Sequence, residues 1–122
     1  MDCKQTKMNL YLSGPLSAKT DKLLKENIEV FARKAYELRE LGHTVFNPTE
    51  NEPPNKSWEW YMARDVDVLY KGIHKQLLWF KFRRKFNAIY MMKGWEDSLG
   101  ARFEKQVAIL LKLKIIYEIC HE

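Results

Sequence analysis

The strongest constraint on the fold is the alternation of short apolar runs with longer helical patterns. Short runs rich in strand-favouring residues occupy positions 8–12, 43–46, 87–92 and 114–119. The segments between them with helical apolar spacing are 20–41, 57–70 and 99–113. An alternating strand–helix order predicts a parallel sheet with right-handed crossovers and flanking helices. We therefore expect one flavodoxin-like or Rossmann-like α/β domain over 1–122, with a sheet of four to five strands.

The first helical pattern has the signals of a packing helix. Thr20 is a suitable N-cap, Asp21 favours the first turn, and Gly42 is suited to the position after the end. An apolar stripe with helical spacing contains Leu24, Ile28, Phe31, Ala35 and Leu38. We assign this helix to packing against the sheet and give it no functional role.

The stretch 94–104 reads as a turn followed by the start of a helix. Asp97 and Ser98 are both good N-caps, and Gly100 falls in the first turn, where a missing side chain lets a ligand approach the backbone. Free N–H groups and the helix dipole make such a place an anion site. Glu104 follows on the same helix. The alternative is an ordinary capped helix with a surface glutamate.

Small residues surround Glu104 on its helix face. Ala101 stands three positions before it and Ala108 four positions after it, which leaves room in front of the carboxylate. The expected packing stripe of this helix consists of Leu99, Phe103, Val107 and Leu110.

A second carboxylate lies on the helix predicted for 57–70. Asp65 stands between Tyr61 and Leu69 at helical spacing, on or beside the buried edge marked by the stripe of Met62, Val66 and Leu69. A carboxylate there is unusual unless it is paired or used. The alternative to a functional role is a salt bridge with Arg64 or a lysine elsewhere.

Two turns at the ends of strands add candidate ligand contacts. Ser13 and Gly14 follow the first strand and offer a hydroxyl and a close backbone approach. No Gly-x-Gly-x-x-Gly or Walker pattern is present in the sequence. Asn47 ends the second strand and faces a pocket if the crevice lies at that edge of the sheet. We interpret His43, beside a helix end, as structural or exposed.

The segment 71–86 concentrates positive charge. The chain has a formal net charge of +5, and this segment holds six basic residues and no acidic one, interleaved with large apolar residues. It extends the preceding helix, forms a separate short helix or protrudes as an arm. Burial in a homo-oligomer interface is the leading interpretation, because so many large apolar residues need covering. Nucleic-acid binding and contact with a membrane surface are the alternatives.

Other features of the sequence bear on localisation, disulfides and metal binding. No apolar run approaches membrane-spanning length and the N-terminus lacks the apolar core of a signal peptide, so we expect a cytoplasmic protein without a membrane partner. Cys3 and Cys120 do not make a disulfide framework, and neither has metal-ligand spacing. We predict no metal and no cofactor.

Five ordered motifs give the chain a family resemblance. They are Tyr11–Pro15, Gly42–Pro48, Ser57–Glu59, Arg64-Asp65 and Gly94–Glu104. Together they closely resemble DUF4406, a family of small bacterial and phage proteins that looks related to the nucleoside 2-deoxyribosyltransferases and the 2′-deoxynucleoside 5′-phosphate N-hydrolases. The resemblance covers nearly the whole chain except 71–86.

The resemblance implies catalytic roles for three residues. Glu104 matches the nucleophile that attacks C1′ of the deoxyribose, Asp65 the acid that protonates the departing base, and Tyr11 a tyrosine that orients the nucleophile. Ser98 and Gly100 match a loop that holds a 5′-phosphate.

The predicted contacts to substrate lie in the strand-end turns and at the start of the last helix. They are Ser13, Gly14, Pro15, Asn47, Ser98, Gly100 and Arg102. Arg102 could bind phosphate, pair with Glu104 or point to solvent. Asn87 departs from the aspartate of many relatives.

Three functions remain open from the sequence. The first is cleavage or transfer at the N-glycosidic bond of a 2′-deoxynucleoside or its 5′-monophosphate, where a carboxylate captures the sugar and an acid protonates the base. The second is a module that binds a nucleotide without turnover. The third is nucleic-acid binding through 71–86.

Overall fold

The computed structural model of the chain describes residues 7–50, 57–79 and 86–119, without the side chains at positions 58 and 70–79. The elements are β1 (Asn9–Ser13), α1 (Asp21–Glu40), β2 (Thr44–Phe46), α2 (Trp58–Trp79), β3 (Ala88–Met91), the 3₁₀ turn η1 (Trp95–Asp97), α3 (Leu99–Leu110) and β4 (Lys114–Tyr117). The predicted order of strands and helices is therefore confirmed.

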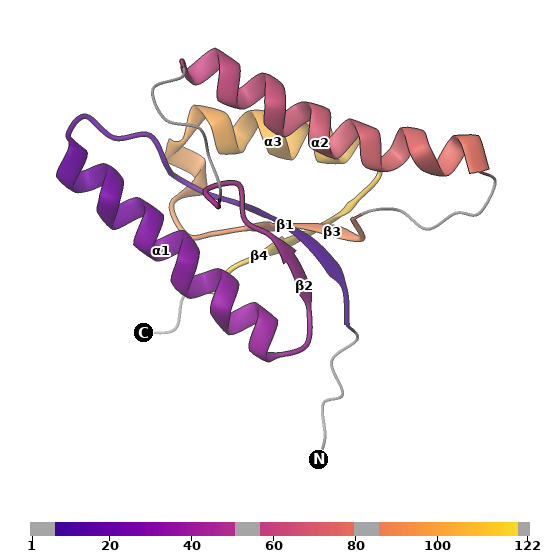
Figure 1. The fold of residues 1–122 in the computed structure, drawn as a ribbon, viewed down its shortest axis with the longest axis horizontal. Coiled ribbons are helices and arrows are strands. Elements are labelled where there is room, and N and C mark those ends of the chain that lie inside the picture. Colours follow the sequence, from indigo (N-terminus) through magenta and orange to yellow (C-terminus); the bar gives the residue numbers. More distant parts are fainter. Residues whose placement is uncertain (1–6, 51–56, 80–85, 120–122) are drawn as a thin grey trace.

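The strands form one parallel sheet in the order β2-β1-β3-β4. Figure 1 shows α1 on one face of the sheet and α2 and α3 together on the other. This is the flavodoxin-like α/β arrangement expected from the sequence. The chain goes from β1 to β2 on one side and then to β3 on the other, so the strand order reverses between β1 and β3. Crevices at such reversals, outside the carboxyl ends of the strands, are where open α/β sheets bind ligands.

The alternation of side chains along β1 divides the interior into two cores. Leu10 and Leu12 point toward α1, and Tyr11 points toward α2 and α3. The core under α1 contains Leu10, Leu12, Phe31, Ala35, Leu38, Val45, Ala88 and Met92. The opposite core contains Tyr11, Leu69, Phe86, Ile89, Met91, Ala101, Ala108 and Leu113. The same alternation places the Ser13 side chain on the same face of the sheet as Tyr11, two positions further along, at the carboxyl end of β1.

The ends of the helices follow local signals. The Thr20 hydroxyl accepts a hydrogen bond from the Leu23 N–H at 3.1 Å and caps α1, as expected. Gly42 follows α1 with a φ of 100°, in the left-handed region that favours glycine. The backbone N–H of Met8 donates to Nδ1 of the buried His43 at 3.1 Å, so of the two interpretations, structural or exposed, His43 is structural.

The predicted packing stripe of α3 is wrong. Leu99 is 66%, Phe103 49% and Leu110 79% exposed, and the residues that α3 buries are Ala101, Glu104 and Ala108. The helix is rotated about its own axis by about one residue position, so the face with its large apolar side chains is not the face toward the sheet. Two alanines allow α3 to lie close to the sheet, and the hydroxyl groups of β1 provide polar partners for Glu104.

The helix predicted for 57–70 is longer than expected. α2 continues to Trp79, which agrees with the interpretation of the basic segment as a helix extension. Phe86 is buried and packs edge-on against Tyr11, with ring centroids 5.6 Å apart, so it belongs to the core and not to an exposed arm. Residues 80–85 lie outside the described residues, as do the side chains at 70–79. The homo-oligomer interface and the nucleic-acid contact predicted for this segment therefore stay predictions.

None of the helices in the described part of the chain combines the length and apolar character needed to cross a bilayer.

Candidate functional site

Glu104 is a buried carboxyl group held by two hydroxyls of β1. It is 5% exposed. The Tyr11 hydroxyl donates to Oε2 at 2.7 Å, and the Ser13 hydroxyl donates to Oε1 at 2.6 Å. Tyr11 and Ser13 are two positions apart on a strand, so both side chains leave the same face of the sheet and reach one carboxyl. The position of the carboxyl is thereby fixed through both oxygens.

Asp65 meets Glu104 from α2. Asp65 is 6% exposed, and its carboxyl is hydrogen-bonded to that of Glu104. The guanidinium of Arg64 donates to Oδ1 of Asp65 from Nε at 3.0 Å and from Nη2 at 2.7 Å. The salt bridge with Arg64 that was weighed against a functional Asp65 is therefore present, and it coexists with the contact between the carboxyls.

Burial and mutual repulsion raise the proton affinity of this pair. Desolvation, followed by the nearby Asp65, raises the pKa of Glu104 to about 8 from an ordinary value of 4.5. Burial also raises the pKa of Asp65, with Arg64 acting in the opposite direction. Two buried carboxyls in contact cannot both ionise without a large cost, so the pair retains one proton near neutral pH.

The carboxyl pair opens into a cavity of about 300 Å³. Its lining comes from the segments that follow β1, β2 and β3 and from α1, α2 and α3. These residues are Gly14, Leu16, Ser17, Ala18, Leu24, Ile28, Phe31, Pro48, Tyr61, Met62, Asp65, Ser98, Gly100, Ala101 and Glu104. The cavity therefore lies at the carboxyl ends of the strands, beside the reversal of strand order, and its size is at the lower end of small-molecule sites.

The N-terminus of α3 forms one wall of the cavity. Ser98 is its N-cap, and the Ser98 hydroxyl oxygen accepts a hydrogen bond from the Ala101 N–H at 3.1 Å. Gly100 lies in the first turn, so no side chain covers the backbone there. The turn before it is made by η1, which begins after Gly94 in the left-handed region at φ 92°.

The predicted site residues fall into three groups. Those that line the cavity are Gly14, Asp65, Ser98, Gly100 and Glu104. Tyr11 and Ser13 lie behind them and act on Glu104, so Ser13 contacts the carboxyl and is not among the lining residues. Those outside the lining are Pro15, Asn47 and Arg102.

Each residue outside the lining has another environment. Asn47 is buried, and its Oδ1 accepts from the N–H and the hydroxyl of Thr49, both at 2.9 Å. Arg102 is exposed on α3. Pro15 packs near Gly94, where an added Cβ would lie 3.2 Å from the Pro15 ring.

Sequence reasoning missed the contribution of α1 to the cavity. Leu24 and Ile28 were assigned to packing against the sheet, but they line the cavity together with Phe31, and Ile28 is 37% exposed. Tyr61 and Met62 of α2 were also not singled out as lining residues. The available signal was position, because α1 follows the loop that begins with Gly14 at the carboxyl end of β1.

Gly14 is required by packing within the protein. A Cβ at this position would lie 2.7 Å from Cε and 2.9 Å from Cβ of Met92. Met92 is 1% exposed, and its backbone N–H donates to the Ser13 carbonyl at 2.8 Å, so its Cβ has little freedom to move. Gly14 lines the cavity, but the space that a side chain would occupy at this position is filled by Met92.

We expect Gly14→Ala to lower the free energy of unfolding by about 1–3 kcal/mol, because the new methyl group overpacks against Met92. Urea denaturation measures this loss. In the double variant Gly14→Ala, Met92→Gly both atoms that the new methyl group would meet are absent, so its loss should be smaller than the sum of the single losses. Strict additivity would contradict the packing explanation.

In the residues that the structure describes, no group of three or more His, Cys, Asp or Glu side chains is arranged to hold a metal ion.

Fold and site together define an α/β protein with a buried carboxyl pair at the strand-order reversal of a parallel sheet. The chain belongs to the family described as "Domain of unknown function (DUF4406)", whose sequence model matches residues 8–117. A search among curated proteins finds no match to the sequence.

Proposed function

We propose that this protein cleaves or exchanges the N-glycosidic bond of a 2′-deoxynucleoside or its 5′-monophosphate. The observation that carries the proposal is the meeting of two buried carboxyls in one cavity with the N-terminus of α3. One carboxyl attacks the sugar and the other protonates the base, and the helix N-terminus suits an anionic substituent of the substrate.

Glu104 is the nucleophile in this proposal. Its carboxylate attacks C1′ as the bond from C1′ to the base nitrogen breaks, and a glycosyl ester with Glu104 forms. Tyr11 and Ser13 support this role because their hydroxyls fix both oxygens, which holds the attacking atom in one place. In the second step water or another base attacks C1′, the bond to Glu104 breaks, and the Asp65 carboxylate takes up the proton that the attacking group loses.

Asp65 is the acid in this proposal. It donates its proton to the base nitrogen as the base departs, and burial supports this role by raising the pKa of the Asp65 carboxyl. Attack by water yields hydrolysis and attack by a second base yields transfer. Ser98 and Gly100 favour a 5′-monophosphate, since both line the cavity at the start of α3, where Ser98 offers a hydroxyl and Gly100 has no side chain.

Incubation with each 2′-deoxynucleoside and each 5′-monophosphate, with and without an added free base, tests the proposal. We expect released base in the absence of acceptor and a new nucleoside or nucleotide in its presence if transfer competes. Chromatography measures both products. Absence of base release from every substrate would contradict the proposal.

A module that binds a nucleotide without turnover is the second candidate. The raised pKa of Glu104 favours it, because a protonated carboxyl is a poor nucleophile at neutral pH. Equilibrium dialysis distinguishes the two. A nucleotide recovered intact after long incubation at every pH from 5 to 9 supports the binding module.

A further inference from the structure

We propose that Arg64 is the positioning residue of the carboxyl pair and decides which of the two carboxyls carries their common proton. With its guanidinium on Asp65, the proton resides on Glu104. Without it, the proton moves to Asp65. This inference concerns the resting protein, and only its consequence for catalysis rests on the proposed function.

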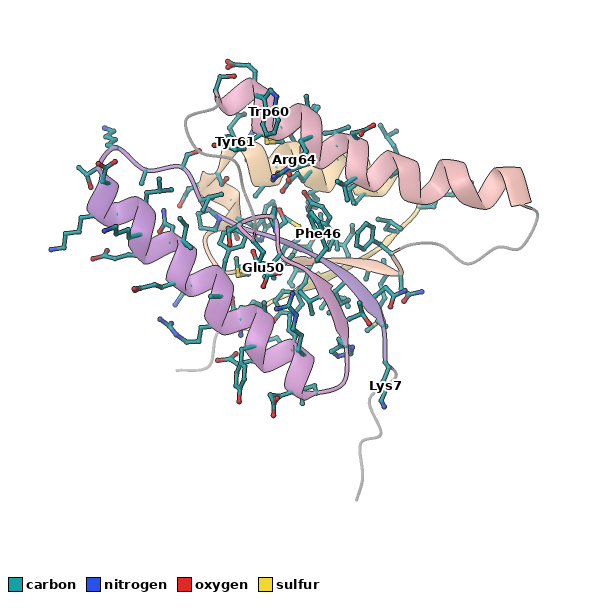
Figure 2. The ribbon with its side chains drawn as sticks, viewed as in Figure 1. Lys7, Phe46, Glu50, Trp60, Tyr61 and Arg64 are labelled. Carbon is teal, nitrogen blue, oxygen red and sulfur yellow. The ribbon has the colours of Figure 1, made fainter. Side chains whose placement is uncertain are left out.

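Hydrogen bonds hold Arg64 beside Asp65. Nε and Nη2 both donate to Oδ1 of Asp65, at 3.0 and 2.7 Å, and Nη2 also donates to the Pro48 carbonyl at 3.0 Å. The guanidinium lies 5.9 Å from the ring centre of Trp60 and 5.8 Å from that of Tyr61. Figure 2 shows these aromatic residues and Arg64 grouped in the first turns of α2. The cation is thus held against one carboxyl by bonds to α2 and to the segment after β2.

Apart from Arg64, two features act on the pair in opposite directions. Burial raises the pKa of both carboxyls and does so most for Glu104, whereas the Tyr11 hydroxyl donates to Glu104 and favours its ionised form. Ser13 donates to Glu104, which favours the ionised form of Glu104. In the described lining of the cavity no residue is Lys, Arg or His. A charge-assisted pair outweighs a neutral hydroxyl hydrogen bond, so Arg64 keeps Asp65 ionised and leaves the proton on Glu104.

This arrangement is the reverse of what glycosidic cleavage requires. Attack needs Glu104 ionised, and protonation of the base needs the proton on Asp65. If the proposed function holds, substrate binding has to weaken the contact between Arg64 and Asp65 before the bond to the base breaks. Tyr61 lines the cavity, and its ring lies 5.8 Å from the Arg64 guanidinium. A substrate in the cavity can therefore act on Arg64 through the Tyr61 ring.

Isotope-edited infrared spectroscopy of the full chain locates the proton. The carbonyl stretch of a protonated carboxylic acid is recorded at pH 7 for protein grown with ¹³C-carboxyl glutamate or with ¹³C-carboxyl aspartate. In the wild type we expect the band to shift with labelled glutamate only, and to be lost in Glu104→Gln. A band that shifts with labelled aspartate would overturn the inference without any variant of Arg64.

The variant Arg64→Met removes the charge and keeps much of the side-chain length. We expect the acid band to shift with labelled aspartate in this variant and with labelled glutamate again in Arg64→Lys. The band of Arg64→Met remaining on glutamate would contradict the role of Arg64. Base release is measured separately, so loss of the proposed function leaves this result standing.

Arg39 provides the matched control. Its guanidinium donates to Glu50 at 2.8 and 2.9 Å and to the Val45 carbonyl at 2.8 Å, so it also joins a carboxylate to a backbone carbonyl. Arg39 does not line the cavity. We expect the band of Arg39→Met to stay on glutamate. A shift in both variants would attribute the effect to lost helix contacts in general and would contradict the inference.

Discussion

Replacement of Glu104 with Gln should lower the rate of base release by at least about 10³-fold, because the amide cannot form the glycosyl ester. The amide retains the shape of the side chain, so the Tyr11 hydroxyl can still donate to it. Chromatographic measurement of released base under single-turnover conditions checks this expectation. The fold is monitored by circular dichroism.

The variant Glu29→Gln is the control for this experiment. Glu29 is an exposed residue of α1 outside the cavity lining, so its loss should leave base release unchanged. Equal base release by wild type and Glu104→Gln would rule out Glu104 as the nucleophile. Equal loss in both variants would show that the assay does not report on the cavity.

The free energy of unfolding of the wild type should fall as the pH rises from about 4.5 to about 8. The folded protein holds a proton on the carboxyl pair more tightly than the unfolded chain does, because burial raises the pKa values of Glu104 and Asp65. The contribution of this proton to the free energy of unfolding is therefore fully present below the pKa of the carboxyls in the unfolded chain. It is lost as the pH rises toward their pKa in the folded protein. A pKa of about 8 for Glu104 corresponds to a loss of up to about 5 kcal/mol.

At acid pH the free energy of unfolding changes in the opposite direction and falls as the pH falls. The pKa of Glu50 is lowered by its hydrogen-bonded ion pair with Arg39. The pKa of Glu118 is lowered by a hydrogen bond from the Lys93 backbone N–H and by the ion pair with Lys34, so these contributions are lost as the pH falls below about 4.5. Urea denaturation from pH 3 to 9 should therefore show a maximum of stability near pH 5. In Glu104→Gln the decline toward pH 8 should largely disappear. An unchanged decline in that variant would contradict the assignment to Glu104.

Most of the fold could be predicted from local patterns. Short apolar runs and helical stripes separated by turn residues predict the order of the elements, and that order restricts a parallel sheet to few arrangements. Caps such as Thr20 and Ser98 were found because their hydrogen bonds span three residues. The orientation of α3 was not predicted. Its large apolar residues favour one face, but contacts distant in sequence determine which face is buried.

The candidate site also has residues that the sequence indicated and residues that it did not. The placement of Asp65 near a buried edge is a local property, so the sequence indicated it. Tyr11 was indicated by the family resemblance, and the strand face that it shares with Ser13 was not predicted, because Ser13 was placed in the turn after the strand. The lining by Leu24 and Ile28 depends on how far α1 extends past the sheet, which no spacing encodes.

The sequence by itself therefore determined the α/β class, the order and type of its elements, and the residues with the chemistry of the candidate site. Only the tertiary structure decided that Glu104 and Asp65 touch, that the Arg64 guanidinium is held between Asp65 and the Pro48 carbonyl, and that Met92 replaces the side chain missing at Gly14. The reason is physical. Hydrogen-bond periodicity acts over a few neighbouring residues, but contacts between elements depend on the packing of side chains far apart in the chain.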